Sequence, residues 1–307
     1  MSESVSICVC ILTFQRPALL EAAIESIQAQ TLLGNPNFKL SGLIVDNDRN
    51  RAGEAVALEF AESPIPFRYA VEENRGVVCG RNRVLQEAGD SDFLAFLDDD
   101  EIATPEWLER LVDTQRKFNA DVVTGPVDSI LEDPPAWVLE GKFFAPRSYS
   151  TGLRPVYVET NNILMKGSLA QRYRFDMLFN ETGGEDTYFF NQIRRDGGVM
   201  VWCEDARVNE TVSAKRTTSE WLIDRERSTA NRLTRCKMIE TPGIATACVR
   251  LTRGLASLGI GSFFLLTSFG SATRSVRGHQ RIARFWGTFF ALRGETHIYY
   301  EQGASLS

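Results

Sequence analysis

Apolar residues gather in three short runs along the first hundred positions, and each run stops at polar residues. Residues 5–13 are β-branched and continuously apolar, as expected for a parallel strand that is covered on both faces. The same pattern recurs at 42–46 and at 93–97, and Pro17 opens a helical pattern after the first run. Strands that alternate with helices predict an α/β fold with a mostly parallel, Rossmann-like central sheet and flanking helices.

Polar side chains stand at the end of each predicted strand, at Thr13, at Asp46 and at the run Asp98-Asp99-Asp100. In open α/β sheets, ligands bind beyond the carboxyl ends of the strands. We therefore expect these side chains to converge at one edge of the sheet.

The middle of the chain continues this pattern less regularly. We expect a helix from Thr104 onward, a strand at 121–127 and a return strand at 160–165. Residues 131–155 are rich in Pro, Gly and aromatic residues, which indicates a long loop that could carry substrate contacts. A further helix is expected to follow Gly183-Gly184-Glu185-Asp186.

The acidic run Asp98-Asp99-Asp100 is the strongest candidate for chemistry. Three adjacent carboxylates repel one another unless a cation offsets them, and oxygen ligands favour hard ions such as Mg²⁺ or Mn²⁺. Alternation along an extended backbone places Asp98 and Asp100 on one side, where they could share a metal. The alternative is a solvated acidic turn at a helix start.

Two further groups could act beside the acidic run. Glu185 and Asp186 follow two glycines, and either carboxylate could serve as a general base, although acidic residues are also ordinary in a first helical turn. Arg81 follows a loop with two glycines and could bind a diphosphate at a helix N-terminus, or simply pair with a surface carboxylate. Asp46 could accept a base or ribose donor, or form an Asx-turn.

Histidine and tryptophan usage narrows the chemistry. The only two histidines are His279 and His297, so a His-rich zinc site or a Ser-His-Asp triad before the tail is excluded. Carboxylate chemistry is left. Trp137, in the Pro-rich loop, could stack on a sugar ring, although apolar packing is the usual role of aromatic side chains.

The charge is unevenly distributed between the body of the chain and its tail. The formal net charge is −6, and the segment from Glu240 onward contributes +4, so the preceding part carries −10. An acidic body argues against nucleic-acid binding, whereas the basic tail could approach anionic lipids. Residues 254–273 lack charge, which leaves open an interfacial or re-entrant segment, a soluble helix pair or a membrane span.

Five motifs in order resemble the family 2 inverting glycosyltransferases, which have the GT-A fold. They are VSICVCILTFQRP (5–17), IVDN (44–47), GRN (80–82), FLDDDE (96–101) and GED (184–186). The resemblance covers roughly residues 5–210. Within the family, the sequence is similar to the bacterial exopolysaccharide branch, which includes succinoglycan-type glucosyltransferases. It implies a GT-A catalytic domain at 1–240, with a nucleotide-sugar half at 1–130 and an acceptor half at 131–240. A helical basic tail would occupy 241–307.

The resemblance also implies roles for individual residues. Asp46 would contact the nucleotide base, Asp98 would lie near the ribose, and Asp100 would bind the metal, Mg²⁺ or Mn²⁺. Asp186 matches the family's general base, and its neighbour Glu185 could contact the acceptor. Many members place a His where Asn209 stands here, so Glu210, water or Arg216 would have to take over its part. The remaining expected contacts are Thr13, Arg16, Arg81 and Asp99 with the donor, Asp98 as a second metal ligand, and Asn161, Asn162 and Trp137 with the acceptor.

The resemblance implies a metal-dependent transfer of a sugar from a nucleotide-sugar donor, with uridine diphosphate favoured. The acceptor would be a saccharide or lipid-linked saccharide in cell-surface or exopolysaccharide synthesis. We expect a cytoplasmic protein at the inner face of the inner membrane, with peripheral contact through the tail and no nucleic-acid partner. Two alternatives remain, a nucleotidyltransferase acting on a sugar phosphate and a non-catalytic carbohydrate-binding relative.

Overall fold

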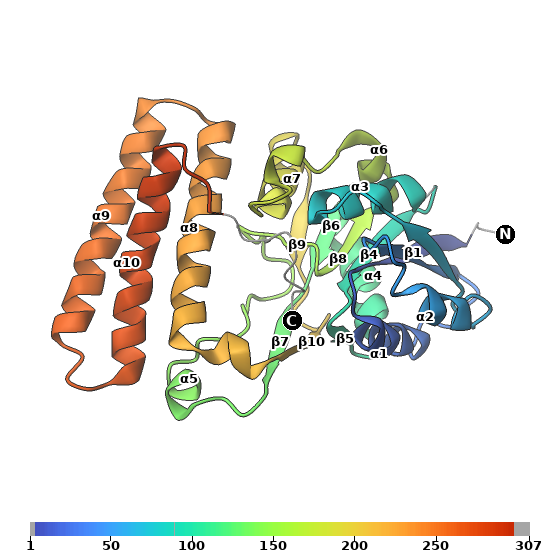
Figure 1. The fold of residues 1–307 in the computed structure, drawn as a ribbon. Helices are drawn as coiled ribbons and strands as arrows, with labels where there is room; N and C mark the ends of the chain where they lie inside the picture. The colour runs from blue at the N-terminus through green and yellow to red at the C-terminus, as the bar shows by residue number, and fades with distance from the viewer. Residues whose placement is uncertain (1–3, 89, 298–307) are drawn as a thin grey trace. The chain divides into compact units, whose positions relative to one another are not determined.

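The computed structural model describes residues 4–88 and 90–297, and these form two compact units (Figure 1). Of the described residues, the first unit comprises 4–88, 90–129, 146–180 and 185–211, and the second comprises 130–145, 181–184 and 212–297. The helix at 219–240 packs within the second unit along the helix at 272–292. Residues 298–307 of the expected tail lie outside the described residues.

A seven-stranded sheet forms the centre of the first unit, in the order β3-β2-β1-β4-β8-β6-β9. The first four of these strands are parallel, β8 runs antiparallel to both of its neighbours, and β6 and β9 are parallel. The expected mostly parallel sheet is thus confirmed. The strands are β1 (Val5–Thr13), β2 (Phe38–Asp46), β3 (Phe67–Val71), β4 (Phe93–Asp98), β6 (Val122–Thr124), β8 (Asn162–Lys166) and β9 (Met200–Trp202).

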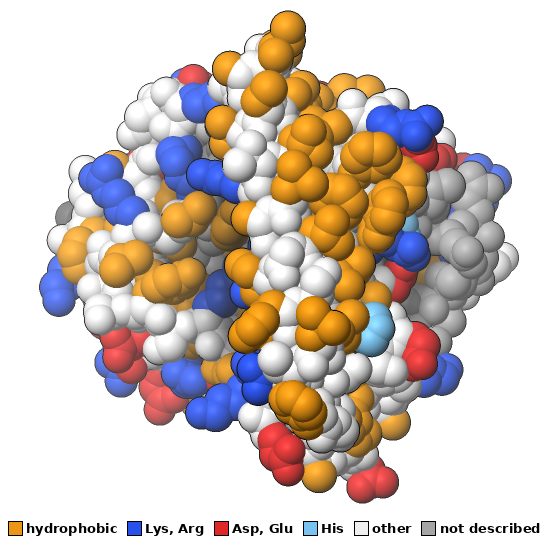
Figure 2. All heavy atoms as spheres, turned by 90° about the vertical axis from the view of Figure 1, so that its left-hand side faces the viewer, with side chains coloured by type: hydrophobic (Ala, Val, Ile, Leu, Met, Phe, Trp, Pro, Cys, Tyr) orange, Lys and Arg blue, Asp and Glu red, His pale blue; other side chains and the backbone are white. Residues whose placement is uncertain are grey.

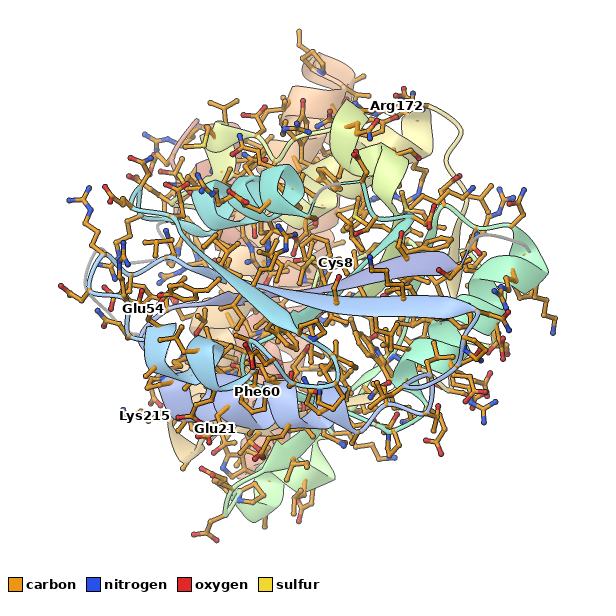
Figure 3. The ribbon with its side chains drawn as sticks, turned by 90° about the vertical axis from the view of Figure 1, so that its right-hand side faces the viewer. Cys8, Glu21, Glu54, Phe60, Arg172 and Lys215 are labelled. Atoms are coloured by element: carbon orange, nitrogen blue, oxygen red, sulfur yellow. The ribbon has the colours of Figure 1, made fainter. Side chains whose placement is uncertain are left out.

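Helices cover both faces of this sheet, as expected for an α/β fold (Figure 1). Cys8 lies in the middle of the sheet and is fully buried, whereas Glu21 and Arg172 lie on the outer surfaces of opposite layers (Figure 3). The two covered faces explain why β1 is apolar along its whole length. One layer holds α1 (Pro17–Gln28), α2 (Glu54–Glu59) and α4 (Trp107–Phe118), and the other holds α3 (Val77–Glu87), α6 (Gly167–Arg172) and α7 (Glu185–Arg195).

A second, three-stranded sheet has the order β5-β10-β7, with bounds Glu101–Ala103, Val208–Val212 and Val127–Leu131. The single strand expected at 121–127 is therefore two strands, β6 and β7. Gly125 and Pro126 separate them. A Cβ at Gly125 would collide with the carbonyl oxygen of Ala206, and Pro126 has no N–H to donate to a ladder.

The second unit is helical and contains α5 (Ala136–Glu140), α8 (Ser219–Glu240), α9 (Ile244–Leu266) and α10 (Ala272–Leu292). Small residues allow these helices to approach closely. A Cβ at Gly261 of α9 would lie 2.7 Å from the carbonyl oxygen of Gly278 on α10, and Ser257 Oγ donates to the carbonyl of Arg281 at 2.9 Å. The uncharged stretch 254–273 is therefore the second half of α9 followed by a turn into α10.

Asn162 at the start of β8 connects three separate segments of the first unit. Its side chain is fully buried, accepts from Trp107 Nε1 at 2.8 Å, and donates to the carbonyls of Pro126 at 3.0 Å and Ala206 at 2.8 Å. Buried polar groups that lose such partners are expensive.

We expect Asn162→Ala to lower the free energy of unfolding by about 2 to 4 kcal/mol, because one buried donor and two carbonyls would lose their partner. Urea denaturation of the full chain measures this change. The matched control is Asn50→Ala, at an exposed position, which should change stability by less than about 0.5 kcal/mol. Equal stability of the two variants would contradict this role for Asn162.

Candidate active site

The ends of three parallel strands meet at one edge of the seven-stranded sheet. Thr13 pairs with Asp46 across β1 and β2, and Leu12 pairs with Asp98 across β1 and β4. The expected convergence of Thr13, Asp46 and the acidic run at the carboxyl edge is confirmed by this register.

The acidic run does not present its three carboxylates in the same way. Asp99 is buried and accepts from Thr13 Oγ1 at 2.7 Å. Arg16 Nη1 contacts both Asp99 Oδ1 at 3.2 Å and Asp100 Oδ2 at 3.1 Å. Arg16 and Thr13 therefore hold Asp99 in place, and Arg16 offsets part of the negative charge of the run.

Asp98 carries an electrostatic penalty at this edge. Burial and the neighbouring charge of Asp100 raise its pKa to about 8, although Arg81 opposes the shift. Burial and the charge of Asp98 also raise the pKa of Glu101 well above its usual range. Carboxylates with raised pKa values favour any ligand that brings positive charge.

A divalent cation fits this part of the chain only if the protein and a bound substrate hold the ion together. Among the described residues, no group of three or more His, Cys, Asp or Glu side chains could hold a metal by itself. Asp98 and Asp100 interact electrostatically and could supply two oxygens. Mg²⁺ is commonly held by one or two carboxylates together with substrate phosphates and water, so two carboxylates are sufficient for such a site.

Asp46 has its hydrogen bonds inside the protein. Its carboxylate is fully buried and accepts from the Gly53 N–H at 2.8 Å, the Tyr69 hydroxyl at 2.8 Å and the Asp48 N–H at 3.0 Å. These bonds organise the loop after β2. A contact between Asp46 and a nucleotide base would have to replace one of them.

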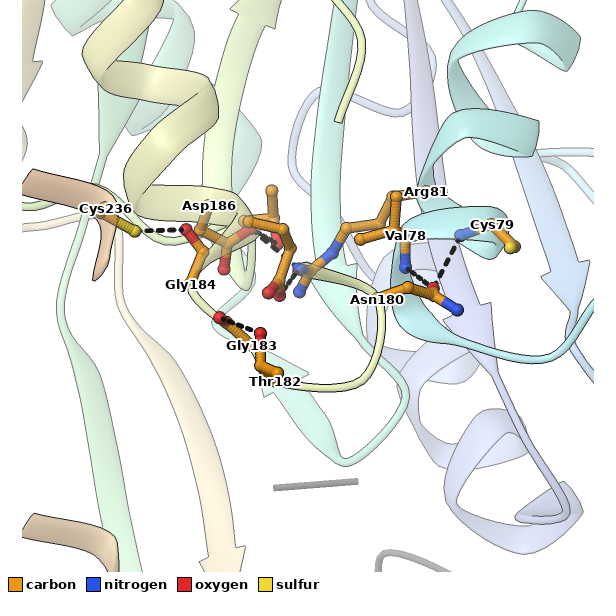
Figure 4. A network of polar contacts seen from close by, with 11 residues as sticks. Val78, Cys79, Arg81, Asn180, Thr182, Gly183, Gly184, Asp186 and Cys236 are labelled. Carbon is orange, nitrogen blue, oxygen red and sulfur yellow. Dashed lines mark hydrogen bonds and ion pairs between the residues drawn. The ribbon is translucent and has the colours of Figure 1, made fainter. Parts of the chain in front are cut away.

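Arg81 contacts both carboxylates at the start of α7, and Figure 4 shows its side chain pointing toward Asp186. Its Nη1 contacts Asp186 Oδ1 at 2.8 Å and also pairs with Glu185. Thr160 Oγ1 donates to the same Asp186 oxygen at 3.1 Å. Arg81 therefore binds the candidate base in this structure, in addition to any contact with a diphosphate. It joins α3 to α7.

The electrostatic surroundings of Asp186 suit proton transfer near neutral pH. Burial raises its pKa to about 7, while Arg81 acts in the opposite direction. The charge of Asp186 in turn contributes to the raised pKa of Asp98, so the two carboxylates belong to one electrostatic network. A general base works best when its pKa lies near the working pH.

The remaining expected residues fall in different environments. Asn161 Nδ2 donates to Glu101 Oε1 at 2.9 Å, beside the acidic run. Asn162 is buried with its amide fully engaged, so its assignment to the acceptor site is not retained. Asn209 pairs with Ile102 across β10 and β5, one residue from Glu101. Trp137 belongs to the second unit, where it lines a cavity of about 400 Å³ with Glu220 and His279.

Sequence reasoning missed two asparagines that shape the site. Asn47 Nδ2 donates to the carbonyls of Glu72 and Asn74, both at 2.8 Å, and thereby fixes the turn before α3. Asn180 Oδ1 accepts from the Val78 N–H at 3.1 Å and caps α3 from a distant segment (Figure 4). Gly76 leaves room for it, since a Cβ there would overlap Asn180. The IVDN motif could have indicated Asn47, but nothing local marks Asn180.

The family model of glycosyl transferase family 2 matches residues 8–179, which include the three strand ends, Arg81 and the acidic run. The chain belongs to glycosyl transferase family 2. It is 30% identical over 230 residues to the succinoglycan biosynthesis protein ExoM of Rhizobium meliloti (strain 1021), an alignment that covers 73% of this chain and 72% of ExoM. It is 26% identical over 245 residues to the glucosyl-dolichyl phosphate glucuronosyltransferase of Haloferax volcanii, covering 72% and 73%.

Solved structures support the GT-A fold for this family member. S. aureus TarS 1-349 in complex with UDP superposes with a TM-score of 0.55 at 13% identity, over 98% of both chains. GalNAc-T7 with UDP, GalNAc and Mn²⁺ also superposes with a TM-score of 0.55 at 13% identity, over 76% of this chain and 51% of the other. The expected family, fold and enzyme class are thus confirmed, and the protein is a glycosyltransferase.

The raised pKa of Asp98 predicts how stability depends on pH. In an unfolded chain an Asp titrates near pH 3.9, whereas folded Asp98 titrates at about 8. The contribution of this group to stability is therefore full below about pH 4 and is lost as the pH rises through 8. We expect Asp98→Asn to be more stable than the wild type by about 1 kcal/mol or more at pH 8.5, as measured by urea denaturation.

A control of opposite sign is available at Asp92. Hydrogen bonds from the Ser6 N–H and hydroxyl lower its pKa, so Asp92→Asn should destabilise the protein at the same pH. A loss of stability for Asp98→Asn at pH 8.5 would show that Asp98 is not strained by its neighbours.

Proposed function

We propose that this glycosyltransferase inverts the configuration of the sugar that it takes from a uridine diphosphate sugar. The observation that carries the proposal is the electrostatic network of the first unit, in which the charge of Asp186 on α7 helps to raise the pKa of Asp98 at the end of β4, and both carboxylates interact with Arg81. This network supplies a carboxylate base on one side and an acidic, cation-favouring run on the other. The match to family 2 supports the same assignment.

In the proposed reaction, Asp186 takes the proton from an acceptor hydroxyl. The hydroxyl oxygen attacks the anomeric carbon from the face opposite the leaving group, and the bond between that carbon and the nucleoside diphosphate oxygen breaks. Both electrons of that bond leave with the diphosphate. Arg81 and Thr160 hold the Asp186 carboxylate in position, and pre-orientation of this kind contributes to catalysis by lowering the entropic barrier.

We propose Asp100 and Asp98 as ligands of Mg²⁺ or Mn²⁺. When bound, such an ion stabilises the charge that develops on the leaving diphosphate. The Mn²⁺ in the GalNAc-T7 structure supports this choice. Asn209 and Glu210 lie on β10 opposite Ile102 and Glu101, so they are close enough in the sheet to complete the oxygen environment through water.

Donor contacts in this proposal come from Thr13, Arg16 and Asp99, which form one hydrogen-bonded group at the end of β1. Asp46 acts on the nucleotide by shaping the loop after β2. Glu185 is nearly buried and paired with Arg81, so it supports the base, while Asn161 beside Glu101 is the candidate acceptor contact in the first unit.

The acceptor in this proposal is a saccharide or a lipid-linked saccharide. The names of the two relatives, a succinoglycan biosynthesis protein and a transferase that acts on a dolichyl phosphate glucoside, support this class. Such an acceptor favours a location at the cytoplasmic face of the membrane, with the basic helical segment 241–297 as the contact. Trp137, on its cavity in the second unit, is the candidate for stacking on a sugar ring.

Removal of the base should stop transfer and spare binding. We expect Asp186→Asn to lower kcat by about 10² to 10⁴ while the Kd for UDP changes little, because the amide keeps the shape but cannot accept the proton. In the wild type, kcat should rise with pH through about 7, as Asp186 loses its proton. Transfer is measured as release of UDP from a uridine diphosphate sugar with acceptor present.

Arg81→Gln tests the same assignment by a shift of the pH profile. Arg81 lowers the pKa of Asp186, so its removal should move the rising limb to higher pH. An unmoved limb, or transfer by Asp186→Asn within about threefold of the wild type, would show that another group is the base.

Removal of the proposed metal ligand should act on donor binding. We expect Asp100→Ala to weaken Mn²⁺-supported binding of UDP by at least about tenfold and to leave metal-free binding nearly unchanged, because Asp100 would help to hold an ion that offsets the charge of the diphosphate. Isothermal titration with and without Mn²⁺ measures both values. Asp90→Ala, an exposed acidic position nearby in the sequence, is the control. Identical Mn²⁺ dependence in Asp100→Ala and the wild type would remove Asp100 from the metal site.

A further inference from the structure

The outward face of α9 is apolar along most of its length. The side chains of Leu255, Phe263 and Leu266 are 51%, 57% and 80% exposed, and Phe269 in the following turn is 91% exposed. Ile260 is 45% exposed on the same side. We call these five residues the apolar face of α9. The four residues on the helix are spaced by about one helical turn, so they share one broad stripe, and Phe269 follows in the turn.

This stripe is not the buried side of a core helix. α9 is long and apolar enough to cross a membrane, and only 17% of its most apolar window is buried within the protein. The buried positions are small residues, Gly254, Ser257 and Gly261, which face α10. The large apolar side chains therefore point outward, and Figure 2, which looks onto this side, shows hydrophobic side chains along it with Lys and Arg at the margins.

The charges within the segment that carries the apolar face have one sign. Residues 241–294 contain seven arginines and neither Asp nor Glu. A second copy of the chain on this face would bring the two sets of arginines together, which is unfavourable. Anionic lipid headgroups complement both properties, since they attract arginine and lie directly above an apolar layer.

The packing of α10 against α9 distinguishes a helix that crosses a bilayer from one that lies flat on it. The Ser257–Arg281 and Gly261–Gly278 contacts place Arg277, Arg281 and Arg284 level with the middle of α9. If α9 crossed the bilayer, these side chains would enter the hydrocarbon layer, where charge is strongly disfavoured. If α9 lies flat, long arginine side chains can reach the headgroups while the apolar face enters the acyl chains.

We propose that α9 lies flat in the interface of a membrane that contains anionic lipid, with its apolar face inserted among the acyl chains. The exposed arginines of α9 and α10, such as Arg253, Arg274 and Arg281, contact the lipid phosphates. The inference goes beyond the proposed reaction and does not depend on it, because membrane binding needs neither donor nor acceptor.

The test is co-sedimentation of the full chain with vesicles of phosphatidylcholine alone and with about one-third phosphatidylglycerol. We expect binding to the anionic vesicles to be roughly tenfold or more stronger and to weaken with salt. Phe263→Ser combined with Leu266→Ser should lower the partition coefficient at least about tenfold. Leu58→Ser, at a 70% exposed apolar position on α2, is the matched control and should bind like the wild type.

Three results would overturn the proposal. The double variant could bind anionic vesicles as well as the wild type does. Bound protein could resist extraction at alkaline pH and leave only with detergent, which would indicate a span. The wild type could form a dimer without lipid that the double variant does not form, which would assign the face to a second copy. Hydrolysis of a uridine diphosphate sugar by the double variant, equal to that of the wild type, shows that the variant is folded and keeps the two proposals separate.

Discussion

The ion pairs of Arg81 with Glu185 and Asp186 are the interactions on which the candidate site depends. They connect α3 to the first turn of α7, and α3 itself is fixed at its start by Asn180. Burying a charge without a partner costs several kcal/mol, so an Asp186 without Arg81 would favour its protonated form. The same guanidinium therefore holds the base in place and keeps its pKa near neutrality.

The carboxyl edge of the sheet holds more negative charge than its cations offset. Arg16 pairs with Asp99 and Asp100, and Arg81 pairs with the carboxylates of α7. Burial and the charge of Asp100 still raise the pKa of Asp98 to about 8. Such an edge is less stable at neutral and alkaline pH than an apolar one. It is also ready to accept a cation together with a diphosphate, because that ligand would remove the repulsion that the free protein carries. The same carboxylates thus lower the stability of the free protein and favour binding of the donor.

The sequence could predict the parts of the site that follow from local pattern. Parallel strands share an edge, so apolar runs ending at Thr13, Asp46 and Asp98 were sufficient to predict their convergence. The pairing of Arg81 with Asp186 was not predictable in this way, because more than a hundred residues separate the two side chains and no local spacing relates them. The surroundings of Asn162 were not predictable for a related reason. Its polarity suggested a ligand contact, whereas its partners, Trp107 and two carbonyls, come from segments that only the fold brings together.

The structure of the uncharged segment 254–273 was also not predictable from the sequence alone, and the packing of α10 selects among the possibilities. Composition alone allowed a span, an interfacial helix or a soluble pair. Each arginine at the centre of a bilayer costs about 2.5 to 3.5 kcal/mol on insertion scales, so Arg277 and Arg281 together would cost roughly 5 to 7 kcal/mol. Arg284 would add to this cost, because its ion pair with Glu226 would be broken or buried with it. The apolar face of α9 gains similar burial when it lies flat, without that penalty. A flat helix also needs no part of α9 to cross the membrane, which suits an enzyme whose proposed donor is a soluble nucleotide sugar.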